Sequence, residues 1–360
     1  MSPVAPSQNL PDGFAGVLLG TAIGDALGLP AENLSPDRIR KWWRGEWRMR
    51  LLFGQGLISD DTEHTLMVAQ ALLTHPEDAV AFQRSLAWKL RWWFVGLPGG
   101  VGLATAKACL RLWLGFPAHR AAVRSAGSGP AMRSAILGAY FAHDPDRRRA
   151  FVAASTGLTH RSWQAETAAQ AVAECAALTR QSQGQPQVTS VLATLRSLSP
   201  EAEWQTVLSR IESGLAAQGS VAEFACTMGL ERGVTGYALH VVPVAIFAWL
   251  RHPDDFRTAL TAALDCGGDT DTVGAILGAL CGAAVGKAGI PAEWSAGLWE
   301  WPRSVSHAER IATQLAAQAQ SRSGQALGPV RYFWPGLVPR NLLFFVVVLV
   351  HGFRRLAPPY

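Results

Sequence analysis

The sequence predicts an all-α protein of compact, orthogonally packed helices, and three observations support this. Strand signals are scarce, because no convincing run of alternating β-branched residues is bounded by turn pairs. Apolar residues instead recur at helical spacing along most of the chain. Two segments also place a glycine at every fourth position, which on a helix forms a stripe without side chains. We therefore expect helices and no sheet.

The helical periodicity divides the chain into one main domain and two flanking segments. We expect a tail over residues 1–11, a helical domain over 12–320, and a linker with an apolar extension over 321–360. Residues 181–188 and 321–329 are polar, contain Gly or Pro, and predict loops. The predicted helices are Phe14–Leu29, Thr62–Leu73, Ala131–Ala142, Trp163–Thr179, Ala202–Gly214, Tyr237–Leu250, Phe256–Leu264, Thr272–Val285 and Val305–Ala317. Pro243 should kink its helix or end its first half, because proline lacks an N–H.

Two of these helices contain the glycine stripes. Each glycine costs about 0.8–1 kcal/mol of helix propensity, so the stripes predict that another backbone approaches closely. Neither helix has the roughly 20 apolar residues that span a bilayer, and both should be buried. The stripes are Gly16, Gly20, Gly24 and Gly28 in the first helix and Gly274, Gly278, Gly282 and Gly286 in the second.

Composition excludes several classes of protein. The 360 residues are only 16% charged, against roughly 25% in an average soluble protein, which excludes a disordered chain. The net charge of +5 is modest and spread along the chain, so no stable nucleic-acid partner is expected. The five cysteines have long gaps and no C-x-x-C, which predicts buried thiols in a reducing cytoplasm rather than disulfides or zinc. Residues 1–11 lack the features of a signal peptide.

Two segments leave alternatives open. The run Leu342–Val350 is too short to span a membrane and is flanked by arginines, so it predicts a buried terminal helix or strand. Interfacial association with a membrane is the alternative. The segment Asp37–Arg50 has three tryptophans among six basic residues. It favours a helix that buries Trp42 and Trp43, over a lid on a cleft or a platform that stacks a nucleotide or nucleic acid.

The most informative feature of the sequence for function is a pair of acidic runs, each at the start of a predicted helix. The runs Ser59–Glu63 and Gly267–Thr272 each precede a predicted helix, and capping alone would explain either one, with Asp60 and Glu63 at the spacing of a capping box. Together they hold four carboxylates and interleaved hydroxyls, more than two helix starts need. Buried carboxylates repel one another, and a hard divalent cation resolves the conflict. The donors are all oxygen, which favours two Mg²⁺ or Mn²⁺ ions over zinc.

These motifs resemble those of the ADP-ribosylglycohydrolase family, which includes the dinitrogenase-reductase-activating glycohydrolases. The resemblance covers about residues 12–300, and its motifs occur in the family's order. The matching segments are Gly16–Gly28 followed by Glu32, Ser59–Thr62, Gly127–Arg133, Thr159–His160, Gly236–Tyr237 through Pro243, and Gly267–Thr272.

The resemblance implies an all-α fold with a central binuclear metal cleft that removes ADP-ribose from modified proteins or small molecules. The implied metal ligands are Ser59, Asp60, Asp61, Asp269, Asp271 and Thr272, and Glu32 touches a metal or its water. The expected catalytic residues are Glu32, Asp60, Asp61 and Asp269. The diphosphate and ribose would face Gly100, Gly102, Ser125, Gly127, Ser128 and Gly129, and the distal ribose His160.

Two departures bear on the substrate. Ser128 stands where the family commonly has asparagine, and Val101 stands where many relatives have an aspartate, so arginine specificity is not implied. The linkage stays open among arginine, serine, nucleic acid and small molecules. The alternative function is a catalytically silent member of the fold that binds ADP-ribose or a nucleotide, or serves as a structural protein. The intact ligand set argues against it. We expect a monomer without a transmembrane span.

Overall fold

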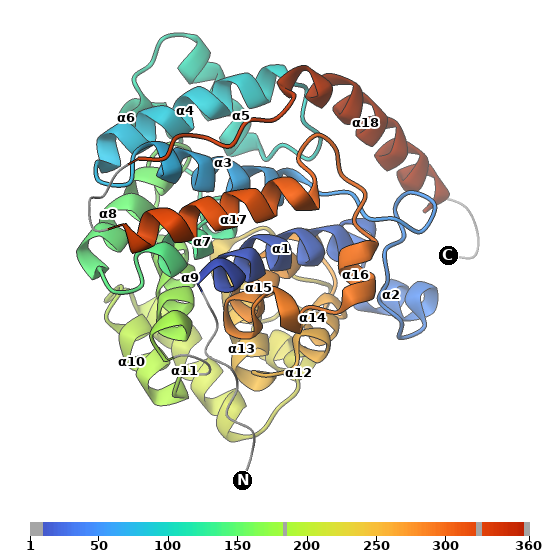
Figure 1. The fold of residues 1–360 in the computed structure, drawn as a ribbon. Coiled ribbons are helices and arrows are strands. Elements are labelled where there is room, and N and C mark those ends of the chain that lie inside the picture. The colour runs from blue at the N-terminus through green and yellow to red at the C-terminus, as the bar shows by residue number, and fades with distance from the viewer. Residues whose placement is uncertain (1–9, 183–185, 322–325, 356–360) are drawn as a thin grey trace.

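A computed structural model describes residues 10–182, 186–321 and 326–355 (Figure 1). Within these ranges the chain forms α-helices and short 3-10 turns, and its only β pairings are isolated bridges. The all-α prediction is therefore confirmed. The predicted tail and the two predicted loops lie partly outside the described residues, but Leu10 and Pro11 already belong to the first helix. The helical domain thus begins before residue 12.

Each segment with predicted helical periodicity lies in helical structure apart from at most two residues at an end, although Ala131–Ala142 is divided by Ser134 into a 3-10 turn, Ala131–Arg133, and a separate helix that ends at Tyr140. The helices are α1 (Leu10–Gly28), α2 (Pro36–Trp43), α3 (Asp60–Thr74), α4 (Ala79–Val95), α5 (Leu103–Trp113), α6 (Ala118–Ala121), α7 (Ala135–Tyr140), α8 (Pro145–Thr156), α9 (Trp163–Gln181), α10 (Val188–Arg196), α11 (Ala202–Ala216), α12 (Val221–Thr227), α13 (Ala238–Arg251), α14 (Phe256–Leu264), α15 (Thr270–Val285), α16 (Ala292–Ala296), α17 (Val305–Gln320) and α18 (Leu337–Arg354).

Pro243 lies inside α13 and does not end it. Proline removes one backbone hydrogen bond, but every residue from Val241 to Leu250 is buried. Tertiary packing therefore keeps the helix continuous past the proline. The alternative that Pro243 ends the first half of the helix is wrong.

The centre of the fold is the antiparallel pair α1 and α15, which lie side by side in Figure 1. Their glycine stripes face each other in reverse order, Gly16 with Gly282, Gly20 with Gly278 and Gly24 with Gly274. A Cβ on any of these six would come closer than 3.0 Å to a carbonyl oxygen of the other helix. The two stripes thus meet each other, as the close approach of a backbone requires. The carboxyl end of α1 consequently lies beside the first turn of α15.

Two helical segments within the described residues are long and apolar enough to cross a membrane, Leu10–Ala31 and Trp334–Arg354. The apolar window of the first is 100% buried, which is typical of the core helix of a folded domain. The window of the second is only 28% buried. The predictions that the first helix and the C-terminal run are too short to span a bilayer are therefore wrong, whereas the predicted burial of the first helix is confirmed.

The apolar C-terminal run forms the helix α18, but the prediction that it is buried is wrong. Its buried face consists of Leu337, Arg340, Asn341, Phe344 and Val347. The run is apolar around its whole circumference, and the body of the protein covers one side of it. An exposed apolar face remains, as the outer position of α18 in Figure 1 agrees.

The segment Asp37–Arg50 forms α2 and an irregular continuation. Trp43 is buried and Trp42 is half-buried, and the guanidinium of Arg38 lies 5.6 Å from the centre of the Trp42 ring. Arg50 lies in the same way 5.3 Å from the Trp43 ring. The prediction that this helix buries its tryptophans is therefore confirmed for Trp43 and confirmed only in part for Trp42.

The cysteines agree with the prediction at four of five positions. All five are free thiols, and Cys109, Cys175, Cys266 and Cys281 are buried. Cys226 is exposed on α12, so its expected burial is wrong. It lies near the end of a short surface helix, where a small apolar residue does not need a partner in the core.

Candidate active site

The first acidic run begins α3, but its residues do not form the capping box. Ser59 is the N-cap, and its Oγ accepts a hydrogen bond from the Asp61 N–H at 3.2 Å. Glu63 turns away from the helix start, because Trp93 Nε1 donates to it at 2.5 Å and Arg303 pairs with it at 2.6 Å. Capping therefore uses the serine alone and leaves the two aspartates of this run for another role.

Asp25 of α1 fixes this helix start in space. Its carboxylate accepts hydrogen bonds from the Ser59 N–H at 2.9 Å and from the N–H and hydroxyl of Thr62. Burial raises the pKa of Asp25 to about 7, although these donors oppose the shift. Asp25 is therefore a buried structural acceptor. It ties α1 to the first turn of α3.

The second acidic run is placed by a glycine turn that joins three segments. Gly267 and Gly268 have φ values of +68° and +82°, where a side chain would be strained. Gly268 donates its N–H to the carbonyl of Leu34 at 2.8 Å, and the Asp269 N–H binds the carbonyl of Val234 at 2.7 Å. Asp269 makes no side-chain capping hydrogen bond to α15. The turn thus places this carboxylate beside Asp271 and Thr272 in the lining of a cavity.

The two acidic runs meet although they are far apart in sequence. Thr272 Oγ1 donates to Asp61 Oδ2 at 3.4 Å, a link between residues 211 positions apart. Ser59 Oγ donates to the same oxygen at 3.1 Å. The other carboxylate oxygens of Asp61 and Asp271 are buried and have no hydrogen-bond partner among the described residues. A buried acceptor without a donor is costly, and this is the kind of oxygen that a cation would satisfy.

A cavity of about 290 Å³ opens between these runs and the glycine loops. Of the predicted site residues, only Ser59 does not line it, because it is buried behind Asp61. No residue of the segment 37–50 lines the cavity, so that segment is not a lid over it. The predicted residues in the lining are Glu32, Asp60, Asp61, Gly100, Gly102, Ser125, Gly127, Ser128, Gly129, His160, Asp269, Asp271 and Thr272. Sequence reasoning missed Leu103, Ala104, Thr105, Met132 and Gly236, which also line it.

His160 lines the cavity beside the glycine loop of Gly127 and Gly129. A Cβ on Gly129 would lie 3.0 Å from His160 Cε1, so the ring packs against this glycine. Arg133 donates to Thr159 Oγ1 at 2.8 Å, and Thr159 Oγ1 lies 2.9 Å from His160 Nδ1; we assign the threonine hydroxyl as the donor in this second hydrogen bond. Burial lowers the pKa of His160 to about 3. The ring is therefore neutral, with its proton assigned to Nε2 by this hydrogen-bond chain.

The carboxylates that line the cavity repel one another when they are charged. Burial and neighbouring carboxylates hold the pKa of both Asp61 and Asp271 well above the usual range. Burial and the charge of Asp269 raise the pKa of Glu32 as well. Within the described residues, no three acidic, histidine or cysteine side chains already converge as a formed metal site. Shared binding of a cation would need these carboxylates to turn toward a common point.

The sequence also gives no sign of the residues at the end of α18, and just after it, that contact the turn of Glu32. Arg355 Nη1 donates to the carbonyl of Glu32 at 2.7 Å, and His351 Nε2 donates to the carbonyl of Pro30 at 2.9 Å. At the other end of α18, Asn341 Nδ2 donates to the carbonyl of Gly96 at 2.7 Å, just before the glycine loop of the cavity. No local motif signals these contacts, because they join segments about 250 to 320 positions apart.

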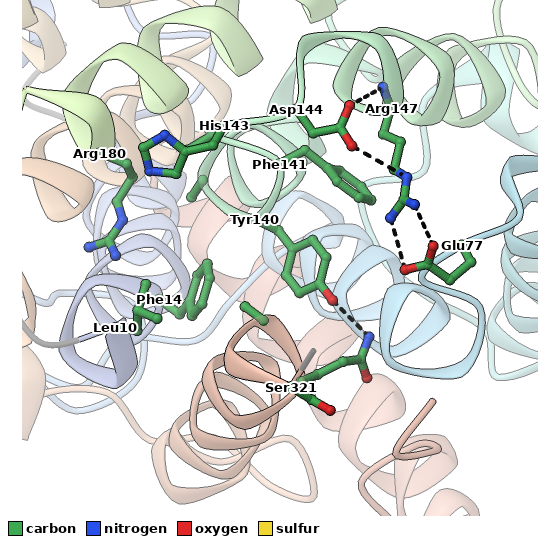
Figure 2. Close-up of a pocket in the computed structure, with 14 residues that line it drawn as sticks. Leu10, Phe14, Glu77, Tyr140, Phe141, His143, Asp144, Arg147, Arg180 and Ser321 are labelled. Carbon is green, nitrogen blue, oxygen red and sulfur yellow. Dashed lines mark hydrogen bonds and ion pairs between the residues drawn. The ribbon is translucent and has the colours of Figure 1, made fainter. Parts of the chain in front are cut away.

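A second hollow of about 650 Å³ lies at the amino end of α1, away from these residues (Figure 2). Figure 2 shows Arg147 between its two carboxylates, Glu77 at 2.5 Å and Asp144 at 3.3 Å. Tyr140 accepts a hydrogen bond from Gln318 Nε2 at 3.0 Å. The carboxylates of this hollow are thus already paired, in contrast to those of the smaller cavity.

The raised pKa of Asp25 leads to a prediction about metal-free protein. Unfolded Asp25 loses its proton near pH 3.8, but the folded residue keeps it to about pH 7, so the folded state binds more protons between these values. That stabilising contribution is lost as the pH rises through about 7. Buried histidines act in the opposite sense, since burial lowers the pKa of His160 to about 3 and that of His307 to about 4. Unfolded histidine is already mostly neutral above about pH 7, so the carboxylates decide the sign there.

We therefore expect the melting temperature in the presence of a chelator to fall by about 1–2 °C or more as the pH rises from about 6.5 to 8, as Asp25 and the other buried carboxylates with raised pKa lose protons. Thermal unfolding followed by circular dichroism across this range measures it. A melting temperature that rises across this range would contradict the raised pKa values of Asp25 and the other buried carboxylates.

A known protein family and a solved structure are similar to this chain over most of its length. The family model described as ADP-ribosylglycohydrolase matches residues 6–325. A solved structure titled "ADP-ribosylglycohydrolase-related protein complex" superposes with a TM-score of 0.64 at 26% identity, covering 87% of this chain and 99% of that chain.

Among sequence relatives, an uncharacterized protein of Archaeoglobus fulgidus is 30% identical over 84% of this chain and 95% of its own length. The ADP-ribosylarginine hydrolase Tri1 of Pseudomonas putida is 26% identical over 88% of this chain and 81% of its own length. The ADP-ribosyl-[dinitrogen reductase] glycohydrolase of Rhodospirillum rubrum is 26% identical over 79% and 89%, respectively. The chain therefore belongs to the ADP-ribosylglycohydrolase family.

Proposed function

We propose that this protein is a metal-dependent hydrolase that cleaves the glycosidic bond between ADP-ribose and a protein side chain or small acceptor. The observation that supports it is the junction of two acidic helix starts, where Thr272 donates to Asp61 across 211 positions of sequence. The cavity beside this junction is also lined by Gly127 and Gly129 and by a neutral imidazole. We expect the enzyme to act as a monomer in the cytoplasm.

The donor set suits two Mg²⁺ or Mn²⁺ ions. Hard divalent cations prefer carboxylate and hydroxyl oxygens, and the buried oxygens of Asp61 and Asp271 that have no hydrogen-bond donor fit them. When bound, the ions would supply positive charge that holds ribose hydroxyls and makes water a better nucleophile. The residues that would hold them are Ser59, Asp60, Asp61, Asp269, Asp271 and Thr272, with Glu32.

The protein's own groups would orient the substrate and move a proton. Glu32 lines the cavity and has a raised pKa, which suits a carboxylate that accepts a proton from the attacking water. His160 would donate from Nε2 to a ribose hydroxyl, because its Nδ1 accepts from Thr159. Because glycine has no side chain, the backbone at Gly127 and Gly129 can approach the diphosphate closely. A side chain at either position would also meet the His160 ring.

The glycine loop at residues 99–102 bears on the linkage. Val101 is half-buried against the core and does not line the cavity, so this loop supplies no carboxylate to pair with a guanidinium. A positively charged acceptor such as a guanidinium would therefore gain little binding free energy from this side of the cavity. We expect arginine-linked ADP-ribose not to be the preferred substrate, although one relative's name specifies that linkage.

The test is release of free ADP-ribose from defined arginine, serine, nucleic-acid and small-molecule linkages. Protein stripped with a chelator should be inactive, and Mg²⁺ or Mn²⁺ should restore release from at least one linkage. Calorimetry with ADP-ribose alone accompanies the assay. Tight binding of ADP-ribose without turnover of any substrate would instead identify a catalytically silent binding protein.

A further inference from the structure

The exposed face of α18 is a continuous apolar stripe. Its residues are spaced three or four apart, the spacing that places side chains on one face of a helix. Their exposed fractions lie between 44% and 69%. The helix also lies outside residues 6–325, the part of the chain that the family model matches. The stripe consists of Leu342, Phe345, Val346, Leu349, Val350 and Phe353.

The helix is fastened to the body at both ends, which fixes the stripe parallel to the protein surface. Near its start, Asn341 binds the carbonyl of Gly96, and Phe344 packs against Gly99. At its end, His351 and Arg355 bind the turn before Asn33. A helix held in this way cannot cross a bilayer lengthwise. It can lay one face into the interface, to a depth of about 5–10 Å.

Further exposed apolar side chains lie on α4 and α5, in ring contact with the segment that leads into α18. The Trp92 ring centre lies 5.7 Å from that of Trp334, which precedes α18, and 5.8 Å from that of Trp113 on α5. Trp92 and Trp113 are themselves exposed. Leu97, at the end of α4, is 60% exposed. Tryptophan is enriched at the boundary between lipid and water, where its ring is half apolar and half polar.

The segments that form this surface carry basic but no acidic residues, although Glu46 and Glu293 line a hollow beside Arg354 at the end of α18. No Asp or Glu occurs between Asp78 and Asp144, which spans α4 and α5, or after Glu309. Arg331 and Arg354 lie exposed at either end of α18. Positive charge around an apolar face complements an anionic lipid surface. Two such faces would repel each other, which disfavours a second copy of this chain as the occupant.

From these observations we propose that α18, together with the exposed tryptophans of α4 and α5, binds the surface of an anionic lipid bilayer. The protein would lie on the membrane without spanning it. Because α18 binds both the turn of Glu32 and the segment before Gly100, the cavity would lie near the lipid surface.

The test is sedimentation of the full chain with two kinds of vesicle, phosphatidylcholine alone and phosphatidylcholine mixed with phosphatidylglycerol. Wild type should bind the mixed vesicles more tightly, and added salt should weaken this binding. The double substitution Phe345→Asp with Leu349→Asp should reduce binding to the mixed vesicles by roughly tenfold or more. The matched control is Val188→Asp with Ala193→Asp, which adds the same charge at exposed positions of α10, at the opposite side of Figure 1. It should bind nearly as wild type does.

Three results would overturn the proposal. They are failure of wild type to sediment with either vesicle, equal loss of binding in both double variants, and a wild-type dimer that only the α18 variant dissociates. The last would make a second copy the occupant, and sedimentation velocity without lipid detects it. Circular dichroism checks that each variant is folded. None of these measurements uses hydrolysis, so they stand apart from the test of the proposed activity.

Discussion

Substituting Asp61→Asn should lower the rate of ADP-ribose release by about a thousandfold or more. The asparagine keeps the size of the side chain but removes its charge and places an amide donor near the hydroxyls of Ser59 and Thr272, both of which now donate to Asp61. Loss of a ligand to a divalent cation removes several kcal/mol of charge stabilisation, which corresponds to a rate factor of this size. Initial rates at saturating Mg²⁺, with calorimetry for uptake of Mg²⁺, measure the effect.

The matched control is Asp146→Asn, the same chemical change on α8, where the side chain is 94% exposed. Its rate should remain within about twofold of wild type, since exposed substitutions away from a site have small effects. If Asp61→Asn kept more than a tenth of the wild-type rate, the two acidic helix starts would not be the catalytic centre.

Substituting Gly24→Ala should destabilise the protein by about 3 kcal/mol or more, or prevent folding. The added methyl group would enter the backbone of Gly274 on α15, which has no flexible side chain that can move aside. This clash could be relieved only if α1 and α15 moved apart. The ends of these two helices carry the turn of Glu32 and the first turn after Asp269. Urea unfolding gives the loss of free energy, and a far-UV spectrum tells whether the variant folds.

Gly13→Ala on the same helix provides the control. Its Cβ would meet only the guanidinium end of Arg180, which is a flexible side chain, so the change should stay within about 1 kcal/mol. Equal destabilisation by the two substitutions would mean that α1 is sensitive along its whole length, and that the glycine contact with α15 is not special.

Much of this arrangement could be predicted because its determinants are local. The glycine stripes are visible as a period of four, and each acidic run directly precedes a helix. The family resemblance then related loops such as that of Gly127 to the same cavity. Helix α4 was missed because tryptophans on its exposed face hide the alternation of apolar and polar residues.

The remaining features depend on contacts between distant parts of the chain. Asp25 among glycines predicts a buried acceptor, but not that its donors are Ser59 and Thr62 of α3. The apolar run of α18 predicts burial by composition, whereas the structure covers one side of it. Which face of such a helix is covered depends on the neighbouring surface, and no pattern within the helix itself records that surface.

The pairing of the first and fifteenth helices has a consequence for synthesis of the protein on the ribosome. The opening helix emerges at once, but the partner for its glycine stripe is translated only after residue 270. Until then the glycine-striped face has no partner, although α3 and α7 can already contact other parts of the helix, so the nascent chain presents an apolar surface to chaperones over most of its translation. The closing of this long loop should be a late step that also assembles the cavity, because Glu32 and Asp269 are brought together by the same event.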